Sequence, residues 1–369
     1  MVTRSGPATL GAAATHPDPY PFYADLVAER PFGRDADSGL WVAAGAAAVS
    51  EVLADPVLRV RPSAEPVPRG IVGTPAGDVF GELVRMTDGT AQAQRRRSLI
   101  AALDAVTEEQ VVALAGEQAA RATGWWDLQF GVPVRVVAAL LGAGGDVPVE
   151  AARLIGDFVR CIPASATAED QAAAAVAAGH LLDLLGPHLR AGGGGLLGAL
   201  VRLSARDGWP QPAPLLANVI GLLSQTYDAT AGLVGNTLLA LARHGRPDDL
   251  VAFVAEVVRH DAPIQNTRRF AAGDTTVAGH HVPAGSTIVL LLAAANRDPL
   301  ANPDPHAFRP GRADPQVFTF GRGAHRCPGR ALATAITVGV ASTVTAAPVH
   351  EGHHPSFNAR IPVLKGQFP

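Results

Sequence analysis

The sequence predicts a mainly α-helical protein with a small β portion, folded as one domain over residues 1–369. Apolar residues from about Thr107 to His244 recur mostly at three- and four-residue steps, which is typical of helices that bury one face. Between Phe270 and Leu290, β-branched residues alternate with polar ones and turn-forming residues bound the runs, which is typical of short strands. Length alone would favour two or three domains. We see no long polar tract and no block of like charge that could serve as a linker, so one domain is the better interpretation.

The individual elements follow from the same periodicity. A strand-like run covers Leu40–Ala44, and the short strands after Pro263 predict a small sheet. We interpret Gly192–Gly195 as a turn between helices and the Pro-rich stretch Asn296–Pro315 as irregular. Apolar spacing predicts helices at Tyr20–Ala28, at about Pro214–His244, at Asp248–His260 and from near Cys327 onward.

Composition narrows the class of protein. The net charge of −3 favours neither nucleic acid nor an anionic membrane as a partner. Lysine occurs once, at Lys365, and the abundance of Ala and Gly indicates a GC-rich bacterial genome. We see no signal-peptide pattern and no apolar run long and clean enough to cross a bilayer. We therefore expect a cytoplasmic protein with no membrane or nucleic-acid partner. As a separate expectation, the chain is a monomer.

The two cysteines, Cys161 and Cys327, lie far apart in the sequence. A reducing compartment argues against a disulfide, so each thiol needs its own explanation. Cys161 lies in a helical apolar stretch and is expected in the core or in a pocket wall. The histidines His350, His353 and His354 could bind a metal, but a solvated tail is the favoured interpretation.

The segment around Cys327 is the most informative part of the chain. It reads Phe320-Gly321-Arg322-Gly323-Ala324-His325-Arg326-Cys327-Pro328-Gly329. Two glycines two positions apart allow a tight turn with unusual backbone angles. Backbone amides in such a turn, and a helix that begins just after the cysteine, would both favour the thiolate over the thiol. These features suit a thiolate that binds the iron of a haem.

Two other interpretations of Cys327 remain open on these residues alone. An isolated cysteine in a glycine-rich turn is more often a buried structural residue. A zinc site would need four ligands, and Cys327 has no cysteine companion nearby in the sequence.

The ten residues resemble the haem-binding signature of the cytochrome P450 family, F-G-x-G-x-H-x-C-x-G, with every fixed position matched. The resemblance implies that Cys327 is the axial ligand of a haem b (iron protoporphyrin IX). It also implies that this loop contacts the cofactor through Phe320, Gly321, His325 and Gly329.

Other segments resemble the same family in the same order along the chain. Glu256-Val257-Val258-Arg259 is similar to the family's E-x-x-R pair, and Arg312 is expected to close a buried network with these two residues. Further similar segments are Pro17–Tyr20, Leu40–Val42, Ala295–Pro299 and Phe308–Arg312. The resemblance therefore implies a triangular, mainly helical prism around a buried haem.

The haem propionates need cationic or hydrogen-bonding partners. The resemblance assigns this role to Arg269, His325 and Arg96, with Gln92 in the place of the histidine that the family usually has. We expect Arg95 and Arg97 at the surface, where they could face a redox partner.

The segment Gln225-Thr226-Tyr227-Asp228-Ala229-Thr230 departs from the family's oxygen-activating pattern, A-G-x-[DE]-T-[TS]. The acid is kept as Asp228, but Ala229 replaces the threonine whose alcohol normally helps to deliver protons. Gln225 lies four residues before Ala229 and so shares its helix face. Either Thr230 supplies the missing alcohol, or the substrate brings its own N–H or O–H to the oxidant. We favour the second interpretation.

The resemblance implies a haem-thiolate oxidoreductase of bacterial natural-product biosynthesis that uses O2 and electrons from a separate ferredoxin and ferredoxin reductase. The distal departures suggest oxidative coupling or cyclisation of a heteroatom-bearing small molecule. The resemblance to family members with altered distal helices implies a substrate derived from tryptophan or a cyclic dipeptide. An ordinary C–H hydroxylating monooxygenase is the alternative. A non-catalytic haem sensor or carrier is the alternative of another class.

Overall fold

The computed structural model describes residues 7, 9–163, 165–192, 194–209 and 212–368. The chain forms two compact units, each assembled from segments far apart in the sequence. Unit 1 comprises Met1–Ser63, Gly232–Cys327 and Ala346–Pro369, and unit 2 comprises Ala64–Ala231 and Pro328–Thr345.

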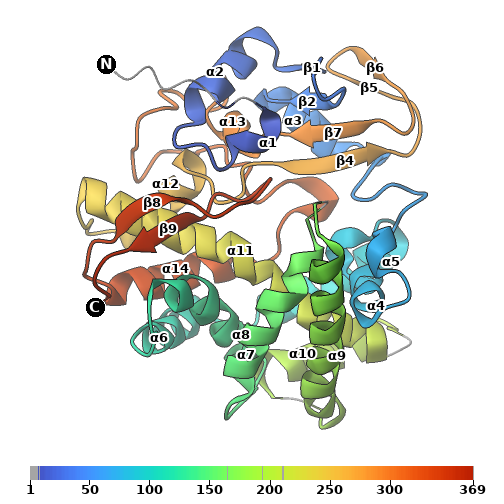
Figure 1. Ribbon diagram of the computed structural model, residues 1–369, viewed down its shortest axis with the longest axis vertical. Coiled ribbons are helices and arrows are strands. Elements are labelled where there is room, and N and C mark those ends of the chain that lie inside the picture. Colours follow the sequence, from blue (N-terminus) through green and yellow to red (C-terminus); the bar gives the residue numbers. More distant parts are fainter. Residues whose placement is uncertain (1–6, 8, 164, 193, 210–211, 369) are drawn as a thin grey trace. The chain divides into compact units, whose positions relative to one another are not determined.

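Unit 1 contains a five-stranded sheet with the strand order β1-β2-β7-β4-β3 (Figure 1). Its strands are β1 (Phe32–Arg34), β2 (Trp41–Ala43), β3 (Leu58–Arg59), β4 (Thr267–Ala271) and β7 (Thr287–Leu290). The β2–β7 pair is parallel and places Trp41 opposite Ile288, whereas the other pairs are antiparallel. Two hairpins complete the β portion: β5 (Thr275–Val277) with β6 (His280–Val282), and β8 (Val349–His353) with β9 (Pro362–Lys365).

Alternation along the strands sends side chains to two apolar clusters, one on each face of the sheet. One cluster joins Ile288 and Leu290 to the helix α3 (Ala46–Ala54). The other joins Val42 and Val289 to three helices, α1 (Leu10–Ala13), α2 (Tyr20–Glu29) and α13 (Leu292–Asn296). The helix α12 (Leu250–His260) also belongs to unit 1.

Unit 2 is helical. It contains α4 (Pro75–Glu82), α5 (Thr90–Leu103), α6 (Glu108–Ala119), α7 (Val132–Leu140), α8 (Val147–Phe158), α9 (Ala168–Arg190), α10 (Gly195–Arg206) and α14 (Arg330–Thr343). Capping boxes at Thr107 and Thr167 mark the starts of α6 and α9. The helices α6 and α14 approach closely at Gly339, where a Cβ atom would lie 2.4 Å from the Val112 carbonyl oxygen. Glycine therefore permits this packing.

The predicted fold class is confirmed, and several boundaries match. The helix predicted at Tyr20–Ala28 is α2, and the one predicted at Pro214–His244 is α11 (Pro212–His244), which continues from unit 2 into unit 1. The Gly192–Gly195 turn connects α9 to α10, although residue 193 lies outside the described residues.

Two predicted helix starts are a few residues early. The helix α12 begins at Leu250, because the Asp249 side chain caps it by accepting from the Ala252 amide. The helix predicted just after Cys327 begins at Arg330, because Pro328 and Gly329 form a turn first.

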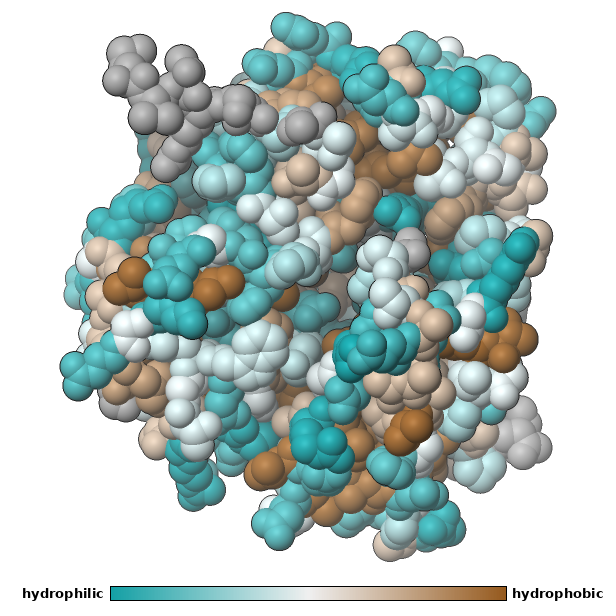
Figure 2. Space-filling model, viewed as in Figure 1, coloured by the Kyte–Doolittle hydropathy of each residue, from teal (hydrophilic) through white to brown (hydrophobic). Residues whose placement is uncertain are grey.

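One helix, α9, has the length and composition of a membrane span. A single such helix is weak evidence, because the core helix of a globular protein meets the same test. Here α9 packs against α4 and α8 and buries Ala174, Ala178 and Leu181. On the face seen in Figure 2, hydrophilic and hydrophobic side chains are intermixed.

Candidate functional site

The cysteine loop of unit 1 is held by its own backbone. The Cys327 amide donates to the Phe320 carbonyl oxygen at 2.8 Å, and the Gly321 amide donates to Phe318 at 2.7 Å. Residues Gly323–His325 form a 3-10 turn that the Arg326 amide closes at 3.1 Å. Cys327 is a free cysteine and is half-buried within this loop.

The two glycines of the loop have left-handed backbone angles, with φ of 64° at Gly321 and 66° at Gly323. A side chain is strained in this region of the backbone. At Gly323 a Cβ atom would also lie 2.9 Å from the Leu53 carbonyl oxygen. A Cβ atom at Gly321 would meet its nearest neighbour, the His325 carbonyl oxygen, only at 3.7 Å. Gly323 thus allows the loop to approach the end of α3.

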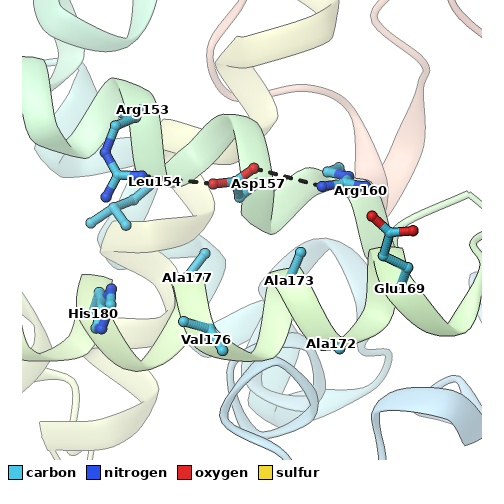
Figure 3. Close-up of a pocket in the computed structure, with 10 residues that line it drawn as sticks. All are labelled: Arg153, Leu154, Asp157, Arg160, Glu169, Ala172, Ala173, Val176, Ala177 and His180. Carbon is cyan, nitrogen blue, oxygen red and sulfur yellow. Dashed lines mark ion pairs between the residues drawn. The ribbon is translucent and has the colours of Figure 1, made fainter.

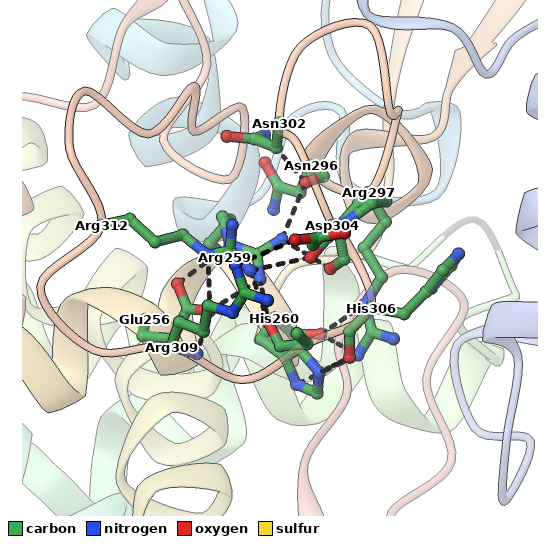
Figure 4. A network of polar contacts seen from close by, with 12 residues as sticks. Glu256, Arg259, His260, Asn296, Arg297, Asn302, Asp304, His306, Arg309 and Arg312 are labelled. Carbon is green, nitrogen blue, oxygen red and sulfur yellow. Dashed lines mark hydrogen bonds and ion pairs between the residues drawn. The ribbon is translucent and has the colours of Figure 1, made fainter.

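Glu256, Arg259 and Arg312 form a buried network in unit 1 (Figure 4). The Arg259 side chain is 0% exposed, and all of its N–H groups donate. Two bonds reach the Glu256 carboxylate, at 2.7 and 2.9 Å, and the others reach carbonyl oxygens of residues 296, 305 and 307. Arg312 donates to the same carboxylate at 3.0 Å. These bonds join α12 to the irregular segment after α13.

The charge of Glu256 depends on these partners. Burial opposes ionisation, but hydrogen bonds from Arg259, from the Arg309 amide and from Arg312, together with the charge of Arg259, hold the pKa of Glu256 below its usual range. The carboxylate therefore stays ionised at neutral pH.

Asn296 and Thr319 extend this network to the approach of the cysteine loop. The Asn296 side chain accepts from the Phe318 amide at 2.6 Å and donates to the Thr319 hydroxyl at 2.8 Å. Thr319 in turn donates to the Val258 carbonyl oxygen of α12 at 2.8 Å. Neither role was predicted from the sequence. The signal was weak, because neither residue belongs to a pattern that specifies a partner.

The predicted propionate partners are divided between the units. In unit 1, Arg269 is buried on β4 and donates to the Arg268 carbonyl oxygen at 2.8 Å, and His325 is half-buried in the 3-10 turn. In unit 2, Gln92 is buried and Arg96 is half-buried, one helical turn apart on α5.

Arg95 and Arg97, on either side of Arg96, differ in their exposure to solvent. Arg97 is exposed, as expected. Arg95 is half-buried and forms an ion pair with Glu82, so the expectation of a surface position was wrong for this residue. The Glu82 carboxylate draws Arg95 inward, which the α5 sequence alone does not indicate.

The distal segment lies on the part of α11 that belongs to unit 2. Gln225 is exposed and donates to the Gly221 carbonyl oxygen at 3.0 Å, and Ala229 is partly exposed. The Asp228 carboxylate is accessible, but burial by the surrounding protein raises its pKa, an effect that the charge of Arg85 opposes. Thr230 is 1% exposed. Thr230 is therefore buried, whereas Gln225 and Asp228 are exposed.

A buried amide attaches α11 to the segment that precedes α5. The Asn218 side chain accepts from the Val84 amide at 2.9 Å and donates to the Glu82 and Pro214 carbonyl oxygens, each at 2.8 Å. This contact was also missed, because a lone asparagine within a helical pattern does not reveal its partner.

The remaining candidates have structural explanations. Cys161 is 3% exposed, and burial raises the pKa of its thiol to about 11. His350 and His353 lie on β8, where His350 is exposed to solvent as expected and His353 is half-buried. Among the described residues, no group of three or more His, Cys, Asp or Glu side chains could hold a metal ion. This result disfavours the zinc interpretation of Cys327.

A pocket in unit 2 lies between α8 and α9 (Figure 3). Three of its charged side chains pair, since Asp157 lies 3.8 Å from Arg153 and 3.9 Å from Arg160. None of the predicted catalytic or haem-contacting residues lines it. We assign no chemistry to this pocket.

Comparisons with known proteins agree with the motif. The model of the family described as cytochrome P450 matches residues 250–341. The chain is 31% identical to cytochrome P450 monooxygenase PikC of Streptomyces venezuelae over 347 residues, which cover 86% of this chain and 80% of PikC. It is 33% identical to 6-deoxyerythronolide B hydroxylase of Saccharopolyspora erythraea over 213 residues, which cover 55% of this chain and about half (52%) of that protein.

A solved structure shows that the likeness extends to the fold. The crystal structure of CalO2 superposes with a TM-score of 0.79 at 23% identity and covers 94% of both chains.

Proposed function

The chain belongs to the cytochrome P450 family, and from this premise we propose that Cys327 would hold the haem by binding its iron as a thiolate. Members of this family are haem-dependent oxidoreductases. When bound, the haem supplies the iron centre at which oxygen is activated. We also propose that both compact units together make the single P450 domain expected from the sequence, because the likeness to CalO2 covers 94% of the chain.

The residues present fit a haem. A soft thiolate suits iron, and the half-buried Cys327 lies in a loop whose shape depends on two left-handed glycines. The two propionates are anions, and Arg269, Arg96 and His325 offer cationic or hydrogen-bonding groups with Gln92 as an added donor. In this proposal, Phe320, Gly321 and Gly329 contact the cofactor through the cysteine loop. The network of Glu256, Arg259 and Arg312 holds the approach to that loop.

We propose that the substrate supplies the proton that a threonine alcohol supplies in most relatives. The carrying observation is the arrangement on α11: Ala229 has no hydroxyl, Thr230 is 1% exposed, and Gln225 presents an exposed amide on the face of Ala229. Asp228 is accessible and has a raised pKa, so it can hold or pass a proton beside Ala229. Such a site suits a substrate with its own N–H or O–H, which reacts by coupling or cyclisation.

The alternative reaction is ordinary C–H hydroxylation. The relatives favour it, because one is named a hydroxylase and another a monooxygenase. Under this alternative Thr230 provides the alcohol.

The remaining features of the proposal follow the family. We propose a role in bacterial natural-product biosynthesis on a tryptophan- or cyclic-dipeptide-derived substrate, in a cytoplasmic monomer. Electrons would come from a separate ferredoxin and ferredoxin reductase.

One experiment tests the ligand. Cys327→Ala should abolish the thiolate-type absorption band of the reduced carbon monoxide complex, whereas Cys161→Ala should keep it. If Cys327→Ala retains the band, Cys327 is not the thiolate ligand.

A second experiment tests the proton source. We would measure coupling efficiency, the fraction of reducing equivalents that appear in product, for Thr230→Ala and Gln225→Ala. Thr230→Ala should lower the coupling efficiency only slightly. Methylation of the polar N–H or O–H of the substrate should divert electrons from product to hydrogen peroxide. Gln225→Ala should shift the products toward simple hydroxylation. A collapse of coupling in Thr230→Ala, with no change in Gln225→Ala, would establish the ordinary mechanism instead.

A further inference from the structure

A π-helical turn at Asp127–Gly131, which leads into α7, supports the distal segment of α11. Single π-turns within helices are uncommon and occur frequently at functional sites. Two side chains at the middle of this turn are buried, Gln129 at 1% exposure and Phe130 at 4%. Both contact the part of α11 that belongs to unit 2, so the π-turn and the distal segment lie in one packed region.

The two contacts lie one helical turn apart on α11. The Gln129 side-chain amide donates to the Ala231 carbonyl oxygen at 3.4 Å. The Phe130 ring packs against the Tyr227 ring, with 4.9 Å between the ring centroids. Because Tyr227 and Ala231 are four residues apart, they share one face of the helix. The π-turn therefore holds this face at two points.

Two further residues restrict the Tyr227 ring. On α8, a Cβ atom at Gly156 would lie 3.0 Å from the Tyr227 hydroxyl oxygen, so a glycine gives the phenol room. Trp126 stacks on Phe130 with 4.2 Å between the ring centroids and supports the ring that contacts Tyr227. Tyr227 is consequently 9% exposed and fixed between α8 and the π-turn.

An ion pair closes the π-turn. The Arg135 guanidinium donates to both carboxylate oxygens of Asp127, at 2.5 and 3.2 Å, and the Thr123 amide donates to the same carboxylate at 3.0 Å. Gly131 makes this pairing possible, because a Cβ atom there would overlap the Asp127 carboxylate. The turn is thus fixed by its own contacts and can hold α11 in one rotational position.

This support explains why Thr230 is buried. Thr230 follows Tyr227 by three residues and directly precedes Ala231, so it lies toward the face that the π-turn holds. Ala229 lies on another face and is partly exposed. Placing Thr230 where Ala229 lies would require a rotation of α11 by one residue, about 100°. Such a rotation would break the hydrogen bond to Ala231 and separate the two rings.

We propose that Gln129 and Phe130 are positioning residues that keep the Thr230 hydroxyl out of the site. The inference deepens the proposed function and rests on its assignment of the distal segment to the site. By withdrawing this hydroxyl, the π-turn restricts the enzyme to substrates that carry their own N–H or O–H group.

Cysteine accessibility tests this placement without a substrate. Thr230→Cys places a thiol at the buried position, and Asp228→Cys places one at an exposed position two residues away. The haem-bound chains would be treated with methyl methanethiosulfonate, and peptide mass spectrometry would give a labelling rate for each thiol. Thr230→Cys should react at least about tenfold more slowly than Asp228→Cys, because a buried thiol reacts only when its segment opens.

Two variants remove the support. Gln129→Leu keeps the size of the side chain but removes the donor. It should raise the labelling rate of Thr230→Cys about five- to tenfold, the change in opened population expected from the loss of one hydrogen bond, and leave Asp228→Cys unchanged. Phe130→Leu removes the ring that contacts Tyr227 and should change the two rates in the same way.

Two controls separate this role from general loosening. Gln171→Leu is matched, because Gln171 donates to the Ala166 carbonyl oxygen at the same 3.4 Å but lies on α9, and it should leave the labelling rates unchanged. Cys161, which is 3% exposed in unit 2, should stay unlabelled in every variant.

The outcomes distinguish the inference from the proposed function. Equal labelling at positions 228 and 230, an unchanged rate of Thr230→Cys in both Gln129→Leu and Phe130→Leu, or a parallel rise in Cys161 labelling would overturn the inference. These results leave the proposed function standing as long as the reduced carbon monoxide complex shows its thiolate-type band. A wild-type chain without that band refutes the proposed function, whatever the labelling rates are.

Discussion

Replacing Glu256 by glutamine removes one charge from the buried network and leaves its shape almost unchanged. Glu256 is 3% exposed and accepts four hydrogen bonds, two from Arg259, one from Arg312 and one from the Arg309 amide. The amide nitrogen of a glutamine must replace one of the two carboxylate oxygens. The mildest arrangement places it where Oε2 accepts from the Nε of Arg259, so that a donor faces a donor.

The free-energy loss can be worked from these contacts. An unmade bond to a buried charged group costs about 1.5–3 kcal/mol. The three remaining bonds then reach a neutral oxygen, and Arg259, which is 0% exposed, loses its only carboxylate partner. Removing one member of a buried ion pair costs about 3–5 kcal/mol in total, and we expect Glu256→Gln to lose that much stability.

Unfolding in guanidinium chloride at pH 7, followed by far-UV circular dichroism and by haem release, measures this loss. Arg309→Ala is the matched control. It keeps the backbone amide that bonds Glu256 and removes only a side chain that is 57% exposed and paired with the 65% exposed Asp304, so it should cost less than about 1 kcal/mol.

The pH dependence gives an independent check. Because the pKa of Glu256 is lowered in the folded state, its contribution is present above the usual value near 4.5 and is lost as the pH falls through the lowered value. The difference between the wild-type chain and Glu256→Gln should therefore narrow in acid. A loss below about 1 kcal/mol at pH 7, or a difference that widens as the pH falls, would refute this account of the network.

Three further predictions concern other parts of the chain. Since burial raises the pKa of Cys161 to about 11, its thiol should resist iodoacetamide at pH 7.5 in the folded protein and react after unfolding, as measured by mass spectrometry. Gly323→Ala should lower haem retention and stability more than Gly321→Ala, because both positions cost about 1–2 kcal/mol of backbone strain but only the first adds a close contact; equal losses would contradict this. Asn218→Ala should cost about 1–3 kcal/mol in denaturant unfolding, because it leaves the Val84 amide unsatisfied.

Features that depend on neighbouring residues could be read from the sequence. The ten residues of the cysteine loop are contiguous, and Gly321 and Gly323 have the unusual backbone angles that the motif implies. The helix α2, the long helix α11 and the small sheet also follow from local periodicity, and their existence was predicted correctly. The family resemblance arose from the same contiguous patterns and is confirmed by PikC over 347 residues.

Other features depend on groups that meet only after the chain has folded. The carbonyl oxygens that satisfy Arg259 lie on an irregular segment, and no residue type encodes a free carbonyl. Asn218 and Asn296 bind backbone groups far away in sequence, which neither composition nor spacing reveals. Local patterns therefore determine which elements form and where the cysteine loop lies, while long-range burial decides which polar groups are paired and which remain available for a ligand.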